Sequence, residues 1–442
     1  MSVATKKILD LNRFDLARSE GFPPDLAERV ARRYASFGAS SVLFYEQPIE
    51  MVRARGAYMY DVDGRQYLDV YNNVPSVGHC HPRVVEAIAR QAGELNIHTR
   101  YLNRVVEAYS ERLLASFPEG LDNVVMTCTG SESNDLAMRI ARIAAGAEGF
   151  IVTEAAYHGN TALVTEVSPS SLRRRRSAPF VSIVPAPAAL EGTSVEESFA
   201  ASVEQAIVEL RARGVGLAAL IVDTIFSSDG IYADPAGFLR EAAGVVKRAG
   251  GLLIADEVQP GFGRTGGGLW GFERHGVTPD IVTMGKPMGN GFPMGGVVTR
   301  SELLKRFCEE TGYFNTFGGN PVAAAAGNAV LQVIEEEGLV ERSATVGSYL
   351  RQSLRSLQKS HAEIGDVRGA GLFLGLDFID PATGEPDVAL ASHAINQMKQ
   401  KGILIGAAGK YGATLKIRPP LCFSTENADF FSATLDAILK AR

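Results

Sequence analysis

Residues 280 to 296 read Asp-Ile-Val-Thr-Met-Gly-Lys-Pro-Met-Gly-Asn-Gly-Phe-Pro-Met-Gly-Gly. The short apolar run from Ile281 to Met284 predicts a buried strand that stops at Gly285, and one lysine, Lys286, follows in a loop rich in proline and glycine. Burying a lysine's charge is costly, so a lysine at the end of a buried strand usually has a lowered pKa, and a neutral amine can form an imine with a carbonyl. A surface lysine in a turn is the simpler interpretation when this loop is taken alone. The neighbouring motifs favour the reactive lysine.

Short apolar runs alternate with helical patterns through the middle of the chain. This alternation predicts an α/β fold with a mainly parallel sheet covered on both faces by helices. Ligands of such sheets lie beyond the carboxyl ends of the strands, so the informative residues should follow each run. Besides 281–284, the predicted strands are 123–127, 149–153, 218–223, 251–255 and 296–298.

The two ends of the chain have a different pattern. Residues 51–70 alternate in polarity around Asp63-Gly64, a dipeptide typical of a β-hairpin. Short strands are expected again within 366–378 and 402–418, between helical patterns. With 442 residues the chain is long enough for a large domain and a smaller α+β domain built from both termini. The predicted limits are 1–75 for an N-terminal arm and part of the small domain, 76–325 for the large domain, and 326–442 for the rest of the small domain.

Composition narrows the classes of protein. The net charge of -6 argues against a nucleic-acid-binding surface, which needs an excess of basic residues. The 4 cysteines lack CxxC spacing and indicate neither a disulfide framework nor a zinc site. No apolar run approaches the length of a membrane span, and the first residues lack a signal-peptide pattern. We expect a cytoplasmic protein that binds neither nucleic acid nor membrane.

Two small residues follow the strand predicted at 123–127 and open a helix. Gly130 and Ser131 belong to the run Cys-Thr-Gly-Ser-Glu-Ser-Asn, residues 128–134. The free N–H groups and the dipole at a helix N-terminus favour an anion such as a phosphate. An ordinary serine N-cap is the alternative.

Aromatic and polar side chains follow two later strands. Tyr157, with His158 beside it, can stack on a planar cofactor, and the alternative is a partly buried tyrosine in a turn. Asp256 can pair with a protonated ring nitrogen, and Gln259 can donate a hydrogen bond to a ring oxygen. A solvated acidic turn is the alternative for this pair.

Three further patterns are set aside. Residues 261–266 match G-x-G-x-x-G, but a dinucleotide fingerprint must open an apolar helix, and Gly-Gly-Leu-Trp follows instead. His79 and His81 lack a third group of ligands and precede Pro82, so packing or helix capping is favoured over a metal site. The basic run 173–176 is interpreted as a solvated loop, with contact to an anionic substrate as the alternative.

Together these strand ends supply an anion site, a stacking ring, an acid, an amide and a lysine. Pyridoxal phosphate needs these partners, because it carries a phosphate, a pyridinium, a phenolic oxygen and an aldehyde. The sequence therefore predicts a site for pyridoxal phosphate, without a metal ion, at one edge of the large sheet.

The same motifs resemble the class III aminotransferases, which have the aspartate aminotransferase fold (pyridoxal-phosphate fold type I). Several longer stretches are more particular and resemble the ethanolamine-phosphate phospho-lyase group within that class. The class motifs are at 78–82, 130–134, 157–159, 256–259, 261–266 and Lys286, and the stretches typical of the group are at 71–74, 77–82, 283–291, 313–321 and 419–423.

This resemblance implies a role for each cofactor contact. Lys286 would hold the cofactor as a Schiff base and later move a substrate proton, and Asp256 would keep the ring nitrogen protonated. Tyr157, next to His158, would stack on the ring. Gln259 would contact the phenolic oxygen. The phosphate would be bound by Gly130 and Ser131, joined by Thr316 from the partner subunit of a homodimer.

Substrate contacts follow less directly from the resemblance. Arg418 matches the position of the arginine that binds a substrate carboxylate in class III transaminases, and its guanidinium suits a phosphate equally well. Asn72 and Asn73 are expected on the substrate side from the resemblance to the phospho-lyase group alone. Ser133 stands where the class usually has alanine, and Pro260 also departs from the class and could shift Gln259.

The function expected from this resemblance is elimination of phosphate from a phosphorylated amine, most directly ethanolamine phosphate. An ω-aminotransferase, which would pass the amino group to a keto acid, is the first alternative. A 5-phosphohydroxylysine phospho-lyase is the second, and a catalytically silent binding protein is disfavoured by the intact Lys286. A homodimer, or a dimer of dimers, with shared active sites is expected.

Overall fold

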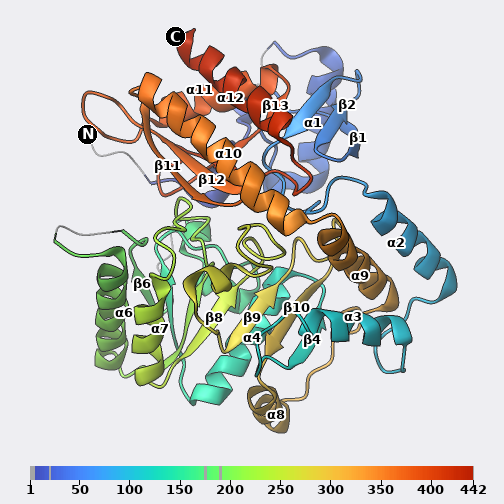
Figure 1. The fold of residues 1–442 in the computed structure, drawn as a ribbon, viewed down its shortest axis with the longest axis vertical. Coiled ribbons are helices and arrows are strands. Elements are labelled where there is room, and N and C mark those ends of the chain that lie inside the picture. Colours follow the sequence, from blue (N-terminus) through green and yellow to red (C-terminus); the bar gives the residue numbers. More distant parts are fainter. Residues whose placement is uncertain (1–4, 19–20, 174–176, 189–191, 442) are drawn as a thin grey trace.

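The computed structural model describes residues 5–18, 21–173, 177–188 and 192–441. Among them, the largest sheet has seven strands: β4 (Asn123–Thr127), β5 (Gly149–Thr153), β6 (Val181–Val184), β7 (Leu217–Val222), β8 (Leu252–Asp256), β9 (Ile281–Met284) and β10 (Gly295–Thr299). Their order is β4-β10-β9-β8-β7-β5-β6 (Figure 1). Neighbouring strands from β9 to β6 run parallel, and β10 runs antiparallel to both of its neighbours.

The predicted mainly parallel sheet is confirmed. The bounds of β4, β5 and β9 are those expected from the sequence, and β7, β8 and β10 differ by one residue at each end. β6 was not predicted, because it is a short edge strand in which Ile183 is exposed and Ser182 interrupts the apolar run. Apolar content alone does not distinguish a parallel strand from the antiparallel β10.

Helices cover both faces of this sheet. α4 (Gly130–Ala145) packs with Phe150 in one apolar cluster, whereas α6 (Val195–Ala212) and α7 (Leu239–Arg248) pack with Ile151 in another. Phe150 and Ile151 are neighbours in β5 and point to opposite faces, as successive strand residues do. Both faces are therefore buried, which explains why the strands are apolar throughout.

Segments near the two ends of the chain lie together above the large sheet (Figure 1). One small sheet combines β1 (Met51–Arg55), β2 (Tyr58–Asp61) and β3 (Gln66–Asp69) with β13 (Ile403–Leu404), which pairs parallel to β3. The hairpin predicted at Asp63-Gly64 is confirmed as the β2–β3 connection. Another sheet has the order β11-β12-β15-β14, with β11 (Ile364–Ala370), β12 (Phe373–Phe378), β14 (Gly406–Ala408) and β15 (Thr414–Ile417).

The remaining helices connect or cover these sheets. We propose the domain limits 1–75, 76–325 and 326–442 with one change: residue 325 lies inside the continuous helix α9, so the limit is better placed at Gly338, where α10 begins. None of the helices in the described part of the chain combines the length and apolar character that a membrane span requires. The helices not yet named are α1 (Pro24–Phe37), α2 (Pro82–Glu94), α3 (Arg104–Leu114), α5 (Ala162–Glu166), α8 (Ser301–Glu310), α9 (Pro321–Glu336), α10 (Leu339–Ser360), α11 (Val388–Gln400) and α12 (Thr425–Lys440).

Candidate active site

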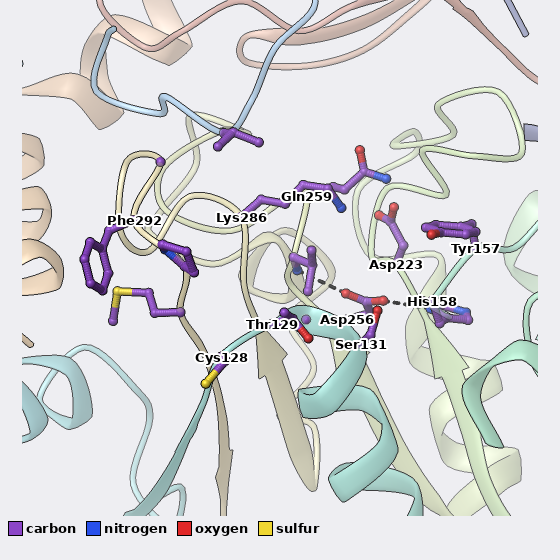
Figure 2. Close-up of a pocket in the computed structure, with 17 residues that line it drawn as sticks. Cys128, Thr129, Ser131, Tyr157, His158, Asp223, Asp256, Gln259, Lys286 and Phe292 are labelled. Carbon is purple, nitrogen blue, oxygen red and sulfur yellow. Dashed lines mark hydrogen bonds and ion pairs between the residues drawn. The ribbon is translucent and has the colours of Figure 1, made fainter. Parts of the chain in front are cut away.

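A cavity of about 310 Å³ opens at the carboxyl ends of the central strands (Figure 2). The loops after β4, β5, β7, β8 and β9 each contribute residues to its wall. Seven of the residues predicted from the sequence line it together: Gly130, Ser131, Tyr157, His158, Asp256, Gln259 and Lys286. The expectation that the chemistry gathers at this edge of the sheet holds for these seven.

The N-terminus of α4 forms one end of the cavity. Thr129 is its N-cap, and the side-chain oxygen accepts a hydrogen bond from the Glu132 amide at 3.1 Å. Gly130 lies so close to the next loop that a Cβ there would be 2.8 Å from a methyl carbon of Val258. Glycine at this position therefore lets the start of α4 pack against the loop after β8. The free N–H groups and the dipole of the first helical turn suit a phosphate.

Ser133, which departs from the class pattern, has a structural explanation. Its hydroxyl lies 2.8 Å from Thr127 Oγ1 and donates to the carbonyl of Met284 at 3.0 Å. Since Met284 ends β9 two residues before Lys286, this serine ties the start of α4 to the lysine loop. The substitution adds a buried but hydrogen-bonded hydroxyl, which is tolerated because its polar group is satisfied.

Asp256 ends β8 and is held by donors on both oxygens. Oδ2 accepts from His158 Nδ1 at 2.8 Å (Figure 2). Oδ2 also accepts from Asn134 Nδ2 at 2.9 Å, and Oδ1 accepts from the Val258 amide at 3.1 Å. The Asn134 amide is itself oriented by the Thr283 hydroxyl at 2.6 Å. These donors stabilise a negative carboxylate at the cavity floor, as pairing with a protonated ring nitrogen requires. His158 therefore acts through Asp256.

Glu257, next to Asp256, points away from the cavity and has a structural role. Its carboxyl group accepts from the amides of Gly271 and Phe272 at 2.7 and 2.9 Å and from the Thr224 hydroxyl at 2.9 Å. Burial raises the pKa of Glu257 to about 8, while these donors oppose the rise. The two acids of the Asp-Glu-Val-Gln motif thus have separate tasks.

Glu257→Ala should lower the free energy of unfolding by about 3 kcal/mol, because it leaves two buried N–H groups unpaired. Chemical denaturation of the apoprotein measures this change. Glu204→Ala, on an exposed position of α6, is the control and should change the free energy by less than about 0.5 kcal/mol. Equal effects of the two substitutions would refute the structural role.

Lys286 projects from the loop after β9 into the cavity. Its side chain is exposed to the cavity space, yet surrounding protein withdraws it from bulk water (Figure 2). This burial lowers the pKa of Lys286, the charge of Arg418 lowers it further, and the charges of Asp256 and Asp223 oppose the change. The amine is therefore biased toward the neutral, nucleophilic form, in agreement with the sequence argument.

Gln259 and Arg418 contact each other at the cavity wall. The Arg418 guanidinium donates to the Gln259 amide oxygen, and Gln259 Nε2 donates to Ser227 Oγ at 2.6 Å. Arg418 is buried and does not line the cavity itself. It lies directly behind Gln259, and its Nη2 has no hydrogen-bond partner among the described residues.

Two charged residues of the site were missed from the sequence. Asp223 lines the cavity, accepts a hydrogen bond from the Ser227 hydroxyl, and has its pKa raised by burial. It follows β7 directly, so the strand-end rule that identified Asp256 also applied here. Lys416, in β15, is buried, and burial followed by the charge of Arg418 lowers its pKa well below the ordinary value. An alternating strand pattern gave no signal for it.

Besides Arg418, three predicted residues lie outside the cavity wall. The Asn72 amide donates to both oxygens of Asp69 at 3.1 Å, so it supports a turn. Asn73 is buried, and its Nδ2 has no hydrogen-bond partner among the described residues. Thr316 is exposed between the exposed side chains of Phe314 and Phe317. A position in another subunit's site is compatible with that exposure.

The patterns set aside from the sequence have ordinary surroundings. Residues 261–266 form turns, and a 3-10 helix at Gly271–His275 follows them. His79 and His81 each contact a carboxylate, and no group of three or more potential ligands for a metal ion occurs in the part of the chain that the structure describes. Arg173 pairs with Asp10 at 2.6 Å, and the rest of the basic run, 174–176, lies outside the described residues.

Comparison with known proteins identifies the family. The family model described as Aminotransferase class-III matches residues 43–439. The chain is 40% identical over 421 residues to "Alanine--glyoxylate aminotransferase 2-like" of Drosophila melanogaster, covering 91% of this chain and 85% of that protein. It is 39% identical over 435 residues to "Ethanolamine-phosphate phospho-lyase homolog 1" of Caenorhabditis elegans, covering 93% of each.

A solved structure is also similar over most of the chain. It is a phospholyase from Arthrobacter in complex with phosphoethanolamine, 42% identical with a TM-score of 0.91, covering 94% of this chain and 100% of that one. The predicted resemblance to the class and to its phospho-lyase group is thus confirmed, as is the fold. Pyridoxal phosphate is the cofactor that the family implies, and the anion site at α4, the donors around Asp256 and a lysine with a lowered pKa fit it. The chain belongs to the class III aminotransferase family.

Proposed function

We propose that the protein is a phospho-lyase that converts ethanolamine phosphate and water to acetaldehyde, ammonia and phosphate. The observation that carries the proposal is the similarity, over 94% of the chain, to a phospholyase whose structure contains phosphoethanolamine.

Bound pyridoxal phosphate supplies an aldehyde for the substrate amine and a ring that withdraws electrons from the carbon next to the nitrogen. Lys286 Nζ would take the proton from that carbon, and Asp256 would hold a proton on the ring nitrogen. The carbon–oxygen bond to phosphate breaks on the neighbouring carbon, and water hydrolyses the released enamine to acetaldehyde and ammonia.

The phosphate group of the substrate needs a positively charged partner, and the Arg418 guanidinium is the candidate. Lys286 is occupied with the amine end, and Arg418 lies behind Gln259 with a free Nη2 group. We propose that Arg418 contacts the substrate phosphate when the Gln259 side chain moves to the cofactor. A guanidinium binds phosphate through paired hydrogen bonds, which would hold the anionic end of the bound substrate.

We propose a homodimer in which each chain completes the other's site. Apolar side chains are exposed in two adjacent segments, and this surface favours association. Thr316 lies within it and would reach the cofactor phosphate of the partner. The exposed residues are Ile97, Tyr101, Leu102, Phe314 and Phe317. The cytoplasmic location stays a prediction from the sequence.

An ω-aminotransferase is the second candidate. The observation in its favour is the similarity to relatives named alanine–glyoxylate aminotransferase. Arg418 serves this function too, because a guanidinium binds the carboxylate of a keto acid as well as a phosphate. The two reactions share the first proton transfer and differ in the fate of the electrons.

A comparison of substrates tests the proposal. The holoenzyme is given ethanolamine phosphate or 5-phosphohydroxylysine, each with and without pyruvate, and phosphate and alanine are measured. We expect phosphate from ethanolamine phosphate at a rate independent of pyruvate, and no alanine. Alanine formation without phosphate release would establish the aminotransferase, and phosphate from 5-phosphohydroxylysine alone would keep the chemistry and replace the substrate.

A further inference from the structure

The motif Gly-His-Cys-His-Pro at 78–82 takes no part in the cofactor contacts, yet one of its histidines is connected to the site. His79 Nε2 lies 2.7 Å from Asp69 Oδ2, the histidine side chain is 13% exposed, and the Asp69 side chain is 0% exposed. A carboxylate only accepts, so the histidine nitrogen donates. Because Asp69 is fully buried at the end of β3, this donor compensates a buried carboxylate.

Asp69 in turn fixes the backbone of the segment that follows it. Oδ1 accepts hydrogen bonds from the amides of Tyr71 and Asn72 at 3.0 and 2.9 Å. The Asn72 side chain adds donors to both oxygens at 3.1 Å. The turn at 69–72 is therefore wound around one carboxylate, whose orientation depends on His79.

This turn holds Arg418. Arg418 Nε donates to the carbonyl of Tyr71 at 3.0 Å, and the Arg418 amide donates to the carbonyl of Val70 at 2.8 Å. The guanidinium carbon lies 5.1 Å from the centre of the Tyr71 ring. The charge of Asp69 also acts on Arg418, opposing the effect of burial, which lowers the pKa of that guanidinium. The turn thus sets both the position and the electrostatic surroundings of Arg418.

We propose that His79 and Asp69 form a positioning unit that aims Arg418 at the anionic group of the substrate. The inference rests on the proposed function, in which Arg418 contacts the substrate phosphate. His79 touches neither cofactor nor substrate and acts only through Asp69, the 69–72 turn and Arg418. Loss of the unit therefore weakens binding of the anionic end and leaves the cofactor contacts intact.

The same motif offers a matched control. His81 lies two residues further on, contacts Glu337 at 3.0 Å, and has a side chain that is 15% exposed. Its partner belongs to the connection between α9 and α10 and makes no contact with the 69–72 turn. Replacing His81 thus removes a histidine of similar exposure from a carboxylate partner, here a glutamate whose side chain is 40% exposed, without reaching Arg418.

The test compares His79→Leu, His79→Gln, His81→Leu and the wild type as holoenzymes. For His79→Leu we expect KM for ethanolamine phosphate and Ki for inorganic phosphate to rise roughly tenfold, because about one charge-assisted hydrogen bond to the anion is lost. Its kcat should stay within about threefold of the wild-type value. His79→Gln, whose amide can donate to Asp69, should recover most of the loss. His81→Leu should match the wild type, and the apoprotein affinity for pyridoxal phosphate should be the same in all four.

A double substitution decides whether the effect passes through Arg418. In an Arg418→Lys background, His79→Leu should raise KM no further, because the guanidinium that His79 positions is already absent. Additive effects, an unchanged KM in His79→Leu, or an equal loss in His81→Leu would overturn the inference. If His79→Leu does not fold, His79→Asn, which is too short to reach Asp69, carries the same expectation. If the wild type transaminates instead of releasing phosphate, the proposed function fails. The positioning unit is then tested by comparing KM for the keto acid between each variant and the wild type.

Discussion

Replacing Lys286 with alanine is expected to lower kcat for phosphate release by about 10⁴-fold or more, the combined loss of a proton-transfer group and of the activated amine. The reason is positional: among the described residues that line the cavity, Lys286 is the only lysine, and burial lowers the pKa of its amine. Phosphate release under saturating ethanolamine phosphate, with pyridoxal phosphate added, measures the change.

Two comparisons make the Lys286 result specific. Lys305→Ala, in α8 with a side chain that is 79% exposed, should keep the wild-type rate. Added methylamine, which is small enough to enter the space vacated in Lys286→Ala, should restore part of the lost rate by taking up the proton. A variant that retains more than about a tenth of the wild-type kcat would show that another group transfers the proton.

Asp256→Asn should lower kcat by about 10³-fold, because a neutral amide cannot hold the proton on the ring nitrogen, and about 4 kcal/mol of electrostatic stabilisation is lost. Asparagine keeps the side-chain volume, and the anion site at Gly130 and Ser131 is untouched. The affinity for pyridoxal phosphate should therefore fall much less than the rate. Steady-state kinetics and fluorescence titration of the apoprotein measure the two quantities.

Asp280→Asn is the matched control for Asp256→Asn. Asp280 precedes β9 at the opposite end of the strand and accepts from the Leu253 amide at 2.8 Å, far along the sheet from the cavity. It should change kcat per folded molecule by less than about twofold. If the affinity of Asp256→Asn for pyridoxal phosphate fell by the same factor as kcat, Asp256 would serve only to bind the cofactor.

Local patterns were sufficient to locate six of the seven strands of the central sheet and seven residues that line the cavity. An apolar run followed by a polar or glycine-rich turn marks a strand end, and the parallel arrangement brings such ends together. Lys286 and Asp256 were identified in this way. The chemistry of the site could be predicted because it depends on which residues follow which strands.

Contacts between distant segments could not be predicted in the same way. The pairing of β13 with β3, the hydrogen bond between Arg418 and Gln259, and the link from His79 to Asp69 join residues whose relation no periodicity records. Asn72 illustrates the consequence: the fold uses its amide to support Asp69, a contact that its motif did not reveal. Long-range geometry, set by packing of the two termini over the large sheet, decides these roles.

The most direct test of the proposed lyase reaction is the stoichiometry of its products. The purified holoenzyme is given ethanolamine phosphate without a keto acid, and phosphate, acetaldehyde and ammonia are measured over many turnovers. The proposal predicts equal amounts of all three, in large excess over enzyme. An aminotransferase would instead form one equivalent of aldehyde product per site, release no phosphate, and resume only when a keto acid is added. That result would contradict the lyase.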